Sequence, residues 1–239
     1  MANHIGDMLR TGSTNFTATE TNLTSLRING TPRDGLWLTP NWTGVTGGTN
    51  AVNTLHAVTS PTGGTYTLTL GGQTTAPINF NDPPATVQAR LGALTNVVLN
   101  NILYPGPIGT GAFAVSGAAT GYAAGDVGIT FQGALANQPV ALTINTAGLT
   151  GGATFSVVAT TTGVGPTCAI TLQESDDNAT WVTPPDWGTI YLPPGLNQLV
   201  RPFTFNTPRK YISATLTFGG TGVFTKLQLP VTNFIEGYN

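Results

Sequence analysis

Polar and apolar residues alternate along several stretches of the chain, most regularly at Thr65–Leu70 (TYTLTL). A period of two is typical of a strand that is buried on one face and exposed on the other. Gly71 and Gly72 follow, and glycines readily adopt the positive φ angles that a two-residue hairpin turn requires. We therefore predict a β-hairpin whose second strand is Ala76–Phe80.

Strand-like stretches recur along the rest of the chain, separated by turns rich in Gly, Pro and Asn. They cover residues 112–115, 127–131, 140–144, 154–159, 169–173, 179–182, 199–205, 210–218 and 223–231. Short strands at such spacing are typical of a β-sandwich or a jelly roll. The sequence thus predicts an all-β protein.

One segment has the period of a helix instead. Its apolar residues recur at intervals of three and four and would form a single stripe: Val87, Leu91, Leu94 and Val98. Asn81 or Asp82 can cap such a helix, and Pro83-Pro84 suits its first turn, where a missing N–H costs nothing. We predict one short helix near residues 84–98.

Charged residues are scarce and unevenly distributed. They make up 8% of the 239 residues, against about 25% in an ordinary soluble domain. The segment 51–165 holds only Asp82, Arg90 and Asp126, and none of the four Trp residues. This change in composition at both boundaries indicates two domains. We predict a jelly-roll or β-sandwich domain, residues 1–50 plus 166–239, interrupted by an inserted β-rich domain, residues 51–165, that carries the helix.

The composition also excludes several classes of protein. A net charge of −2 argues against a nucleic-acid binder, which clusters Lys and Arg against phosphates. No apolar run approaches the length of a membrane span, and the N-terminus does not resemble a secretory signal. We therefore expect assembly in a cytoplasm and no nucleic-acid or membrane partner. The single cysteine, Cys168, reads as a small buried hydrophobe.

Catalytic and metal-binding motifs are largely missing, so we predict a protein that is not an enzyme and has no cofactor. The acidic cluster Glu174, Asp176 and Asp177 could bind Ca²⁺ or supply a pair of glycosidase carboxylates. It could equally be the polar tip of a hairpin, which Asn178 favours; we prefer this interpretation.

The four Trp residues lie outside the inserted segment and have two possible roles. They are Trp37, Trp42, Trp181 and Trp187. Aromatic faces can form a platform on which sugars stack. In a β-sandwich, however, a Trp more often packs in the core or in an interface, and we favour that role.

Part of the inserted segment resembles a module of phage virion proteins. The stretch 64–78 (GTYTLTLGGQTTAPI) followed by 85–94 (ATVQARLGAL) is similar to a strand, turn and helix found in virion proteins of tailed phages. The stretch 127–136 (VGITFQGALA) resembles the strand and turn that come next in those proteins. The likeness covers about residues 63–145.

The flanking segments resemble capsid decoration, or cement, proteins of tailed phages. The stretch 171–181 (TLQESDDNATW) is similar to a hairpin of that family. Four shorter stretches resemble its other motifs: 7–12 (DMLRTG), 192–195 (LPPG), 208–212 (PRKYI) and 219–225 (GGTGVFT). The inserted segment 51–165 is the departure, since compact members of the family lack it.

This resemblance implies a virion structural protein that binds the major capsid protein on the capsid exterior and stabilises the shell. It further implies a jelly roll and a homotrimer. As candidates for contacts with an acidic capsid surface or a neighbouring subunit we name Arg10, Arg201, Arg209 and Lys210. The alternative function is a receptor- or glycan-binding module of a tail fibre or capsid spike.

Overall fold

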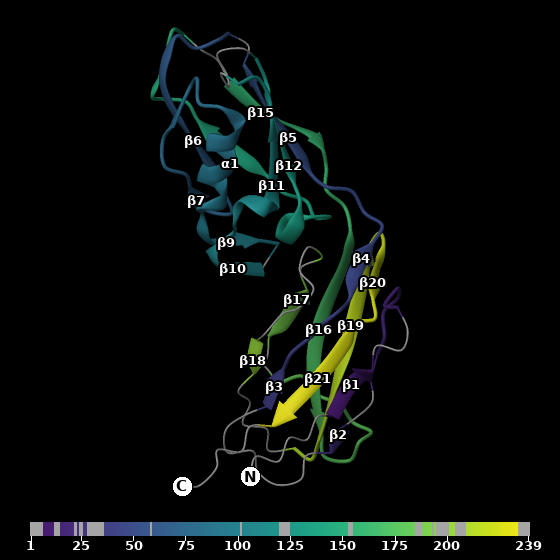
Figure 1. Cartoon of the computed structure of the whole chain (residues 1–239). Coiled ribbons are helices and arrows are strands. Elements are labelled where there is room, and N and C mark those ends of the chain that lie inside the picture. Colours follow the sequence, from purple (N-terminus) through teal and green to yellow (C-terminus); the bar gives the residue numbers. More distant parts are fainter. Residues whose placement is uncertain are drawn as a thin grey trace, which may run out of the picture. The chain divides into compact units, whose positions relative to one another are not determined.

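Figure 1 shows a computed structural model of the chain. The structure describes residues 7–11, 15–21, 23, 26–27, 36–57, 59–100, 102–119, 125–152, 155–184, 188–192, 194, 201–203 and 209–233, with the backbone alone at 7–11, 26–27, 36–37, 201–203 and 232–233. These residues form mostly β-strands and one α-helix, so the predicted all-β class is confirmed. The chain divides into two compact units: unit 1 is Met1–Gly47 with Pro166–Asn239, and unit 2 is Gly48–Gly165.

Unit 1 contains two four-stranded antiparallel sheets. The first has the order β1-β21-β3-β18, formed by β1 (Asp7–Thr11), β21 (Gln228–Asn233), β3 (Leu36–Leu38) and β18 (Arg201–Phe203). The second has the order β17-β16-β19-β2, formed by β17 (Thr189–Leu192), β16 (Pro166–Ser175), β19 (Tyr211–Gly220) and β2 (Leu26–Arg27). The short strands β4 (Gly44–Thr46) and β20 (Val223–Thr225) pair with each other.

Both sheets of unit 1 bury side chains in one apolar cluster. Three alternate residues of β16 belong to it, Cys168, Ile170 and Leu172, and Leu38 and Leu229 join it from the other sheet. This arrangement is a β-sandwich, because the apolar positions of two sheets share one core. The interpretation of Cys168 as a buried hydrophobe is confirmed.

Unit 2 contains two further sheets, a two-stranded hairpin and the helix. The first sheet has the order β11-β12-β5-β15, formed by β11 (Phe113–Ser116), β12 (Val127–Phe131), β5 (Val52–Ala57) and β15 (Phe155–Thr161). In the second, β6 (Gly63–Leu70) pairs with β7 (Gln73–Thr74), β8 (Ile78–Asn79), β13 (Leu142–Asn145) and β14 (Leu149–Thr150). The hairpin is β9 (Thr95–Leu99) with β10 (Ile102–Pro107), and two 3-10 turns lie at Thr110–Ala112 and Gly133–Leu135.

The predicted hairpin after β6 forms at the glycine pair. Gly71 and Gly72 have φ angles of 52° and 81°, the positive values that such a turn requires. The returning segment differs from the prediction of one strand over residues 76–80. It pairs with β6 in two short pieces, β7 and β8, separated by residues 75–77.

The helix α1 (Pro84–Gly92) is shorter than predicted. Val87, Leu91 and Leu94 are buried, but Val98 lies on β9 with 51% of its surface exposed. The backbone of Gly92 packs so closely on Thr110 that a Cβ there would lie 2.7 Å from the Thr110 nitrogen. The predicted extension to residue 98 is wrong because the chain pairs with β10 beyond Leu94, where Val98 continues the apolar spacing by coincidence.

The predicted side-chain cap of α1 is also wrong. Pro83 occupies the N-cap position and makes no side-chain cap. The carboxylate of Asp82 instead accepts a hydrogen bond from the backbone N–H of Asn79 at 2.9 Å.

A second difference concerns the predicted strand 223–231, which divides into β20 and β21 where Lys226 adopts a φ of 52°.

The two ends of unit 2 are tied to each other. The backbone N–H of Thr49 donates to the carbonyl of Val164 at 2.7 Å, and the reverse bond measures 2.9 Å. In unit 1, Thr46 pairs with Val223 and Pro166 pairs with Gly220, so both attachment points flank one turn of unit 1. Unit 2 is therefore a domain inserted into a single connection of unit 1, the one between β4 and β16.

We expect unit 1 to fold without its insertion. A variant with Gly48–Gly165 replaced by four Gly or Ser residues should unfold cooperatively, with a midpoint within about 5 °C of the full chain's unit 1 transition. Circular dichroism and NMR amide dispersion would measure this. A variant without dispersed amide signals would contradict the expected independence of the two units.

Candidate contact surfaces

Charged side chains gather at one end of unit 1, which we call the charged end: Glu174, Asp176, Asp177, Arg209 and Lys210. They lie where β16 finishes and β19 begins, since Ser175 pairs with Tyr211. The insertion point lies at the other end of the same strand pair, beside Pro166 and Gly220. Ten residues of strand separate the two ends, which corresponds to about 30 Å.

Arg209 forms ion pairs within its own unit. Its Nε donates to Oε1 of Glu174 at 3.0 Å, and its Nη1 donates to Oδ2 of Asp176 at 3.3 Å. The Glu174 side chain is only 9% exposed and that of Arg209 is 35% exposed. The guanidinium therefore offsets part of the cost of burying the Glu174 carboxylate.

Asp177 closes the turn that follows β16. Its carboxylate accepts hydrogen bonds from the backbone N–H groups of Thr180 and Ala179 at 2.7 and 2.9 Å, and from the Ser175 hydroxyl at 2.8 Å. These donors favour the ionised form and hold the pKa of Asp177 well below its usual range. Asn178 follows with a φ of 61°, as expected for Asn in a tight turn.

This geometry favours the hairpin tip over the calcium or glycosidase alternatives for the acidic cluster. Glu174 and Asp176 turn toward a guanidinium, and Asp177 is saturated by donors from its own turn. Within the described ranges, no group of three or more His, Cys, Asp or Glu side chains could hold a metal ion.

The structure describes the side chains of two of the four predicted contact residues, Arg209 and Lys210. The backbones of Arg10 and Arg201 lie on β1 and β18, the opposite edges of one four-stranded sheet, and their side chains are outside the described residues. Lys210 is exposed beside Arg209 at the charged end. Of the two described side chains, Lys210 is the better placed for a partner, because Arg209 already pairs with two carboxylates.

The tryptophans that the structure describes do not form a sugar platform. Trp42 is buried in the core of unit 1 and meets the Phe224 ring edge-on, with ring centroids 5.6 Å apart. Trp181 is half-buried. The side chains of Trp37 and Trp187 lie outside the described residues.

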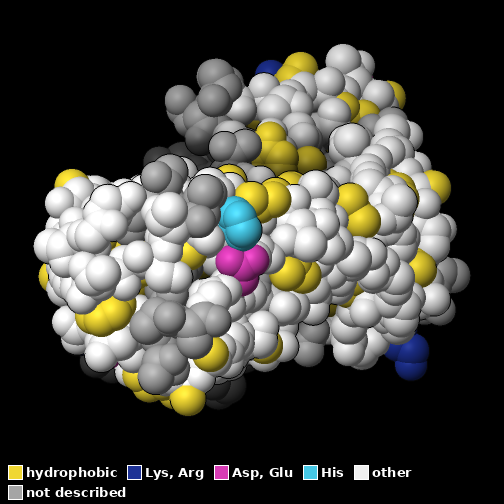
Figure 2. Space-filling model, turned by 90° about the horizontal axis from the view of Figure 1, so that it is seen from above, with side chains coloured by type: hydrophobic (Ala, Val, Ile, Leu, Met, Phe, Trp, Pro, Cys, Tyr) yellow, Lys and Arg dark blue, Asp and Glu magenta, His cyan; other side chains and the backbone are white. Residues whose placement is uncertain are grey.

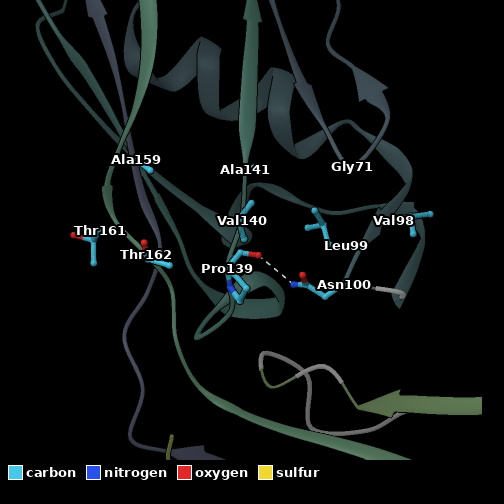
Figure 3. Close-up of a pocket in the computed structure, with 10 residues that line it drawn as sticks. All are labelled: Gly71, Val98, Leu99, Asn100, Pro139, Val140, Ala141, Ala159, Thr161 and Thr162. Carbon is cyan, nitrogen blue, oxygen red and sulfur yellow. Dashed lines mark hydrogen bonds between the residues drawn. The ribbon is translucent and has the colours of Figure 1, made fainter. Parts of the chain in front are cut away.

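A shallow hollow of about 450 Å³ opens on unit 2, at the ends of β9, β13 and β15 (Figure 3). Its lining is uncharged and has no aromatic ring: Gly71, Val98, Leu99, Asn100, Pro139, Val140, Ala141, Ala159, Thr161 and Thr162. The Asn100 amide donates to the Pro139 carbonyl at 3.1 Å, so it already has a partner. The hollow therefore suits uncharged groups. It offers no aromatic ring on which a sugar could stack.

A histidine and a carboxylate meet on the surface of unit 2, a pairing that sequence reasoning missed. His56 Nδ1 lies 2.9 Å from Asp126 Oδ1, and both side chains are about half exposed. Figure 2 shows such a pair on a face where most side chains are uncharged. The contact with His56 lowers the pKa of Asp126. It joins the end of β5 to the start of β12 across 70 residues of sequence, a separation that no local pattern reveals.

Within the described part of the chain, no helix is long and apolar enough to cross a membrane.

The Asp177 turn should contribute stability that depends on pH. The folded pKa lies below the unfolded value near 3.8, so the contribution is complete above that pH and disappears as the pH falls through the folded pKa. Asp177→Asn should thus lower the urea midpoint at pH 7, and the difference from wild type should shrink below pH 4. Asp176→Asn is the comparison; its carboxylate is 61% exposed and makes one longer contact with Arg209, so it should lower the midpoint less. An equal difference at pH 7 and pH 2.5 would contradict this role.

Arg209 and Lys210 should differ in their effect on folding. Arg209→Gln removes a positive charge 3.0 Å from the largely buried Glu174 carboxylate and should cost about 1–3 kcal/mol of unfolding free energy. Lys210→Gln should cost less than about 0.5 kcal/mol, as exposed substitutions usually do. Urea titrations of both variants would measure this, and equal losses would show that the Arg209 ion pairs contribute nothing specific.

The chain matches no protein-family model and no curated protein. Its function is therefore inferred from its own residues and their geometry.

Proposed function

We propose that the chain is a virion structural protein that binds the outer surface of a tailed-phage capsid and stabilises the shell. Unit 1 is the capsid-binding jelly roll, associated as a trimer, and unit 2 is an additional lobe. The observation that carries the proposal is the charged end of unit 1, because residues 171–181, a stretch that resembles a hairpin of decoration proteins, contribute three of its five charged side chains.

The resembling stretch coincides with a defined structural feature. Residues 171–175 complete β16, Asp177 closes the turn, and Val182 returns to bond with Glu174 at 2.9 and 3.0 Å. A second resembling stretch, 219–225, forms the turn between β19 and β20. Asn178, Gly220 and Gly222 have positive φ angles in these two turns, and Asp177 accepts hydrogen bonds from its own turn. The turns thus depend on residues that the resembling stretches contain, which supports a fold shared with decoration proteins.

The outer face of the β16-β19 sheet also suits a densely packed lattice. Three partly exposed positions of this face carry hydroxyl or amide groups, Thr171, Gln173 and Thr215, and Thr215 donates to Gln173 at 3.0 Å. Such a face can be buried against a protein without the desolvation cost of unpaired charges. Many copies, each bound weakly, then stabilise a shell by their number.

Lys210 is the contact candidate that the proposal favours for an acidic capsid surface. It is exposed at the charged end, and no ion pair joins it to any described residue. Arg209 has an indirect role in the proposal. Its ion pairs with Glu174 and Asp176 stabilise the hairpin next to Lys210.

The alternative of a glycan-binding module has less support. Aromatic rings on an accessible surface would favour it. Tyr191 is 39% exposed and Trp181 is half-buried, but Trp42 lies in the core and the hollow of unit 2 has no aromatic lining.

The proposal is tested by adding the purified chain to expanded capsids that lack an outer protein. We expect co-sedimentation with the capsids and a higher temperature of shell disruption in calorimetry. Lys210→Glu should weaken binding by about three- to tenfold through lost charge complementarity. Lys226→Glu, the same change at another exposed lysine of unit 1, should leave binding unchanged.

Folded protein that does not co-sediment with expanded capsids would overturn the proposal. Equal losses for Lys210→Glu and Lys226→Glu would refute the role of the charged end and leave only a general electrostatic attraction.

A further inference from the structure

Three exposed polar residues lie in one row across neighbouring strands of unit 2. Ser156 on β15 is the register partner of His56 on β5. Asp126 directly precedes β12, whose Val127 pairs with Leu55, the residue before His56. Register partners point to the same face of a sheet, with Cβ atoms about 4.5–5.5 Å apart. The row therefore places a hydroxyl on one side of the imidazole and a carboxylate on the other.

The carboxylate of Asp126 holds the imidazole through one nitrogen. Its Oδ1 and Oδ2 lie 2.9 and 3.0 Å from His56 Nδ1, and Oδ1 also accepts from the backbone N–H of Ala57 at 3.3 Å. An ionised carboxylate can only accept, so the shared hydrogen is on Nδ1. In the neutral ring the lone pair is then on Nε2, which is the tautomer that a general base for a serine requires.

The surroundings of this row are uncharged. Residues 48–165 include three charged residues, Asp82, Arg90 and Asp126, and His56 is their only histidine. The next row of the same face carries Thr54 and its register partner Val158, which is 47% exposed. Figure 2 likewise shows a histidine and an acidic side chain in contact at the surface, among uncharged side chains. A charged substrate would thus find no counter-charge here beyond the row itself, which favours an uncharged one.

The strand that carries the hydroxyl can also supply a donor for a negatively charged oxygen. β15 is the last strand of its sheet. Alternate N–H groups of such a strand point away from its neighbour, and backbone N–H groups are the usual donors to a developing oxyanion. The pairing is regular from Phe155 to Ala159, and its register shift lies beyond Ala159. Ser156 therefore sits in the regular part of the strand.

We propose that Ser156 is a nucleophile for the hydrolysis of uncharged carboxylic esters, with His56 as its general base and Asp126 as the positioning residue. The site lies wholly within unit 2 and does not rest on the proposed capsid binding. Ser156 and His56, both described side chains, are not hydrogen bonded to each other in the free chain. Nucleophile and base often come within hydrogen-bond distance only when substrate is bound.

The reaction has two steps. Ser156 Oγ bonds to the ester carbonyl carbon while its proton passes to His56 Nε2; the carbon–oxygen bond to the alcohol breaks, and the alcohol leaves with that proton. Water then attacks the acyl-serine and gives a proton to Nε2, which returns it to Oγ as the carboxylic acid is released.

The test is the reaction of the full chain with a fluorophosphonate, which bonds to the Oγ of an activated serine and releases fluoride. We expect a single label at Ser156 in peptide mass spectrometry. The labelling rate should rise between about pH 5 and pH 8, because only unprotonated imidazole accepts a proton. His56→Gln should slow labelling about a hundredfold and remove this rise, and Asp126→Asn should slow it at least about tenfold.

Two controls separate this role from general reactivity. Ser116→Ala removes an exposed serine of β11 in the same sheet, whose register partner is Gly128, and should leave labelling unchanged. The uncharged ester 4-nitrophenyl acetate should leave an acetyl group on Ser156, which acid quenching would trap.

The proposal would be overturned by any of three results. The first is a rate at Ser156 no higher than that of a serine in a short peptide. The second is equal labelling of folded wild type and folded His56→Gln. The third, which needs no variant, is a wild-type rate that does not change between about pH 5 and pH 8.

Discussion

The antiparallel ladder between β16 and β19 is the interaction on which unit 1 depends. Ten consecutive pairs join Pro166–Ser175 to Tyr211–Gly220, and this ladder connects the two ends of the unit. One face of it provides Ile170, Leu172 and Leu216 to the core. At one end it holds the attachment points of unit 2, and at the other it brings Glu174 next to Arg209. Loss of register in this ladder would therefore disturb the core, the insertion and the charged end together.

The sequence patterns predicted the strands that are buried on one face. The strand 127–131 matches β12 at both ends, since its apolar residues all face inward and glycine or threonine faces outward. The same reasoning failed after α1, where Val98 continues a helical spacing by coincidence and instead lies exposed on β9. Periodicity reports which residues can share a face, and it does not report where backbone pairing takes over from a helix.

The candidate site was predictable only in part. The turn at 174–178 could be expected, because Asp and Asn favour such geometry in any context. The pairing of Arg209 with Glu174 could not, because 35 residues separate them and the register of β16 with β19 brings them together. The jelly-roll topology, the trimer and the capsid partner remain predictions. Arg209, named as a candidate contact, forms ion pairs with Glu174 and Asp176 within its own unit.

The mutual attachment of the two ends of unit 2 has a consequence for folding order. Because the N–H and carbonyl of Thr49 bond to Val164, a folded unit 2 presents its termini as if they were two neighbouring residues. The conformational entropy lost on bringing the two ends of the insertion together is then lost when unit 2 folds. The connection that unit 1 has to close is correspondingly short. Once unit 2 has formed, β4 and β16 are joined by a short effective connection, so we expect their separation in sequence to slow the assembly of unit 1 little.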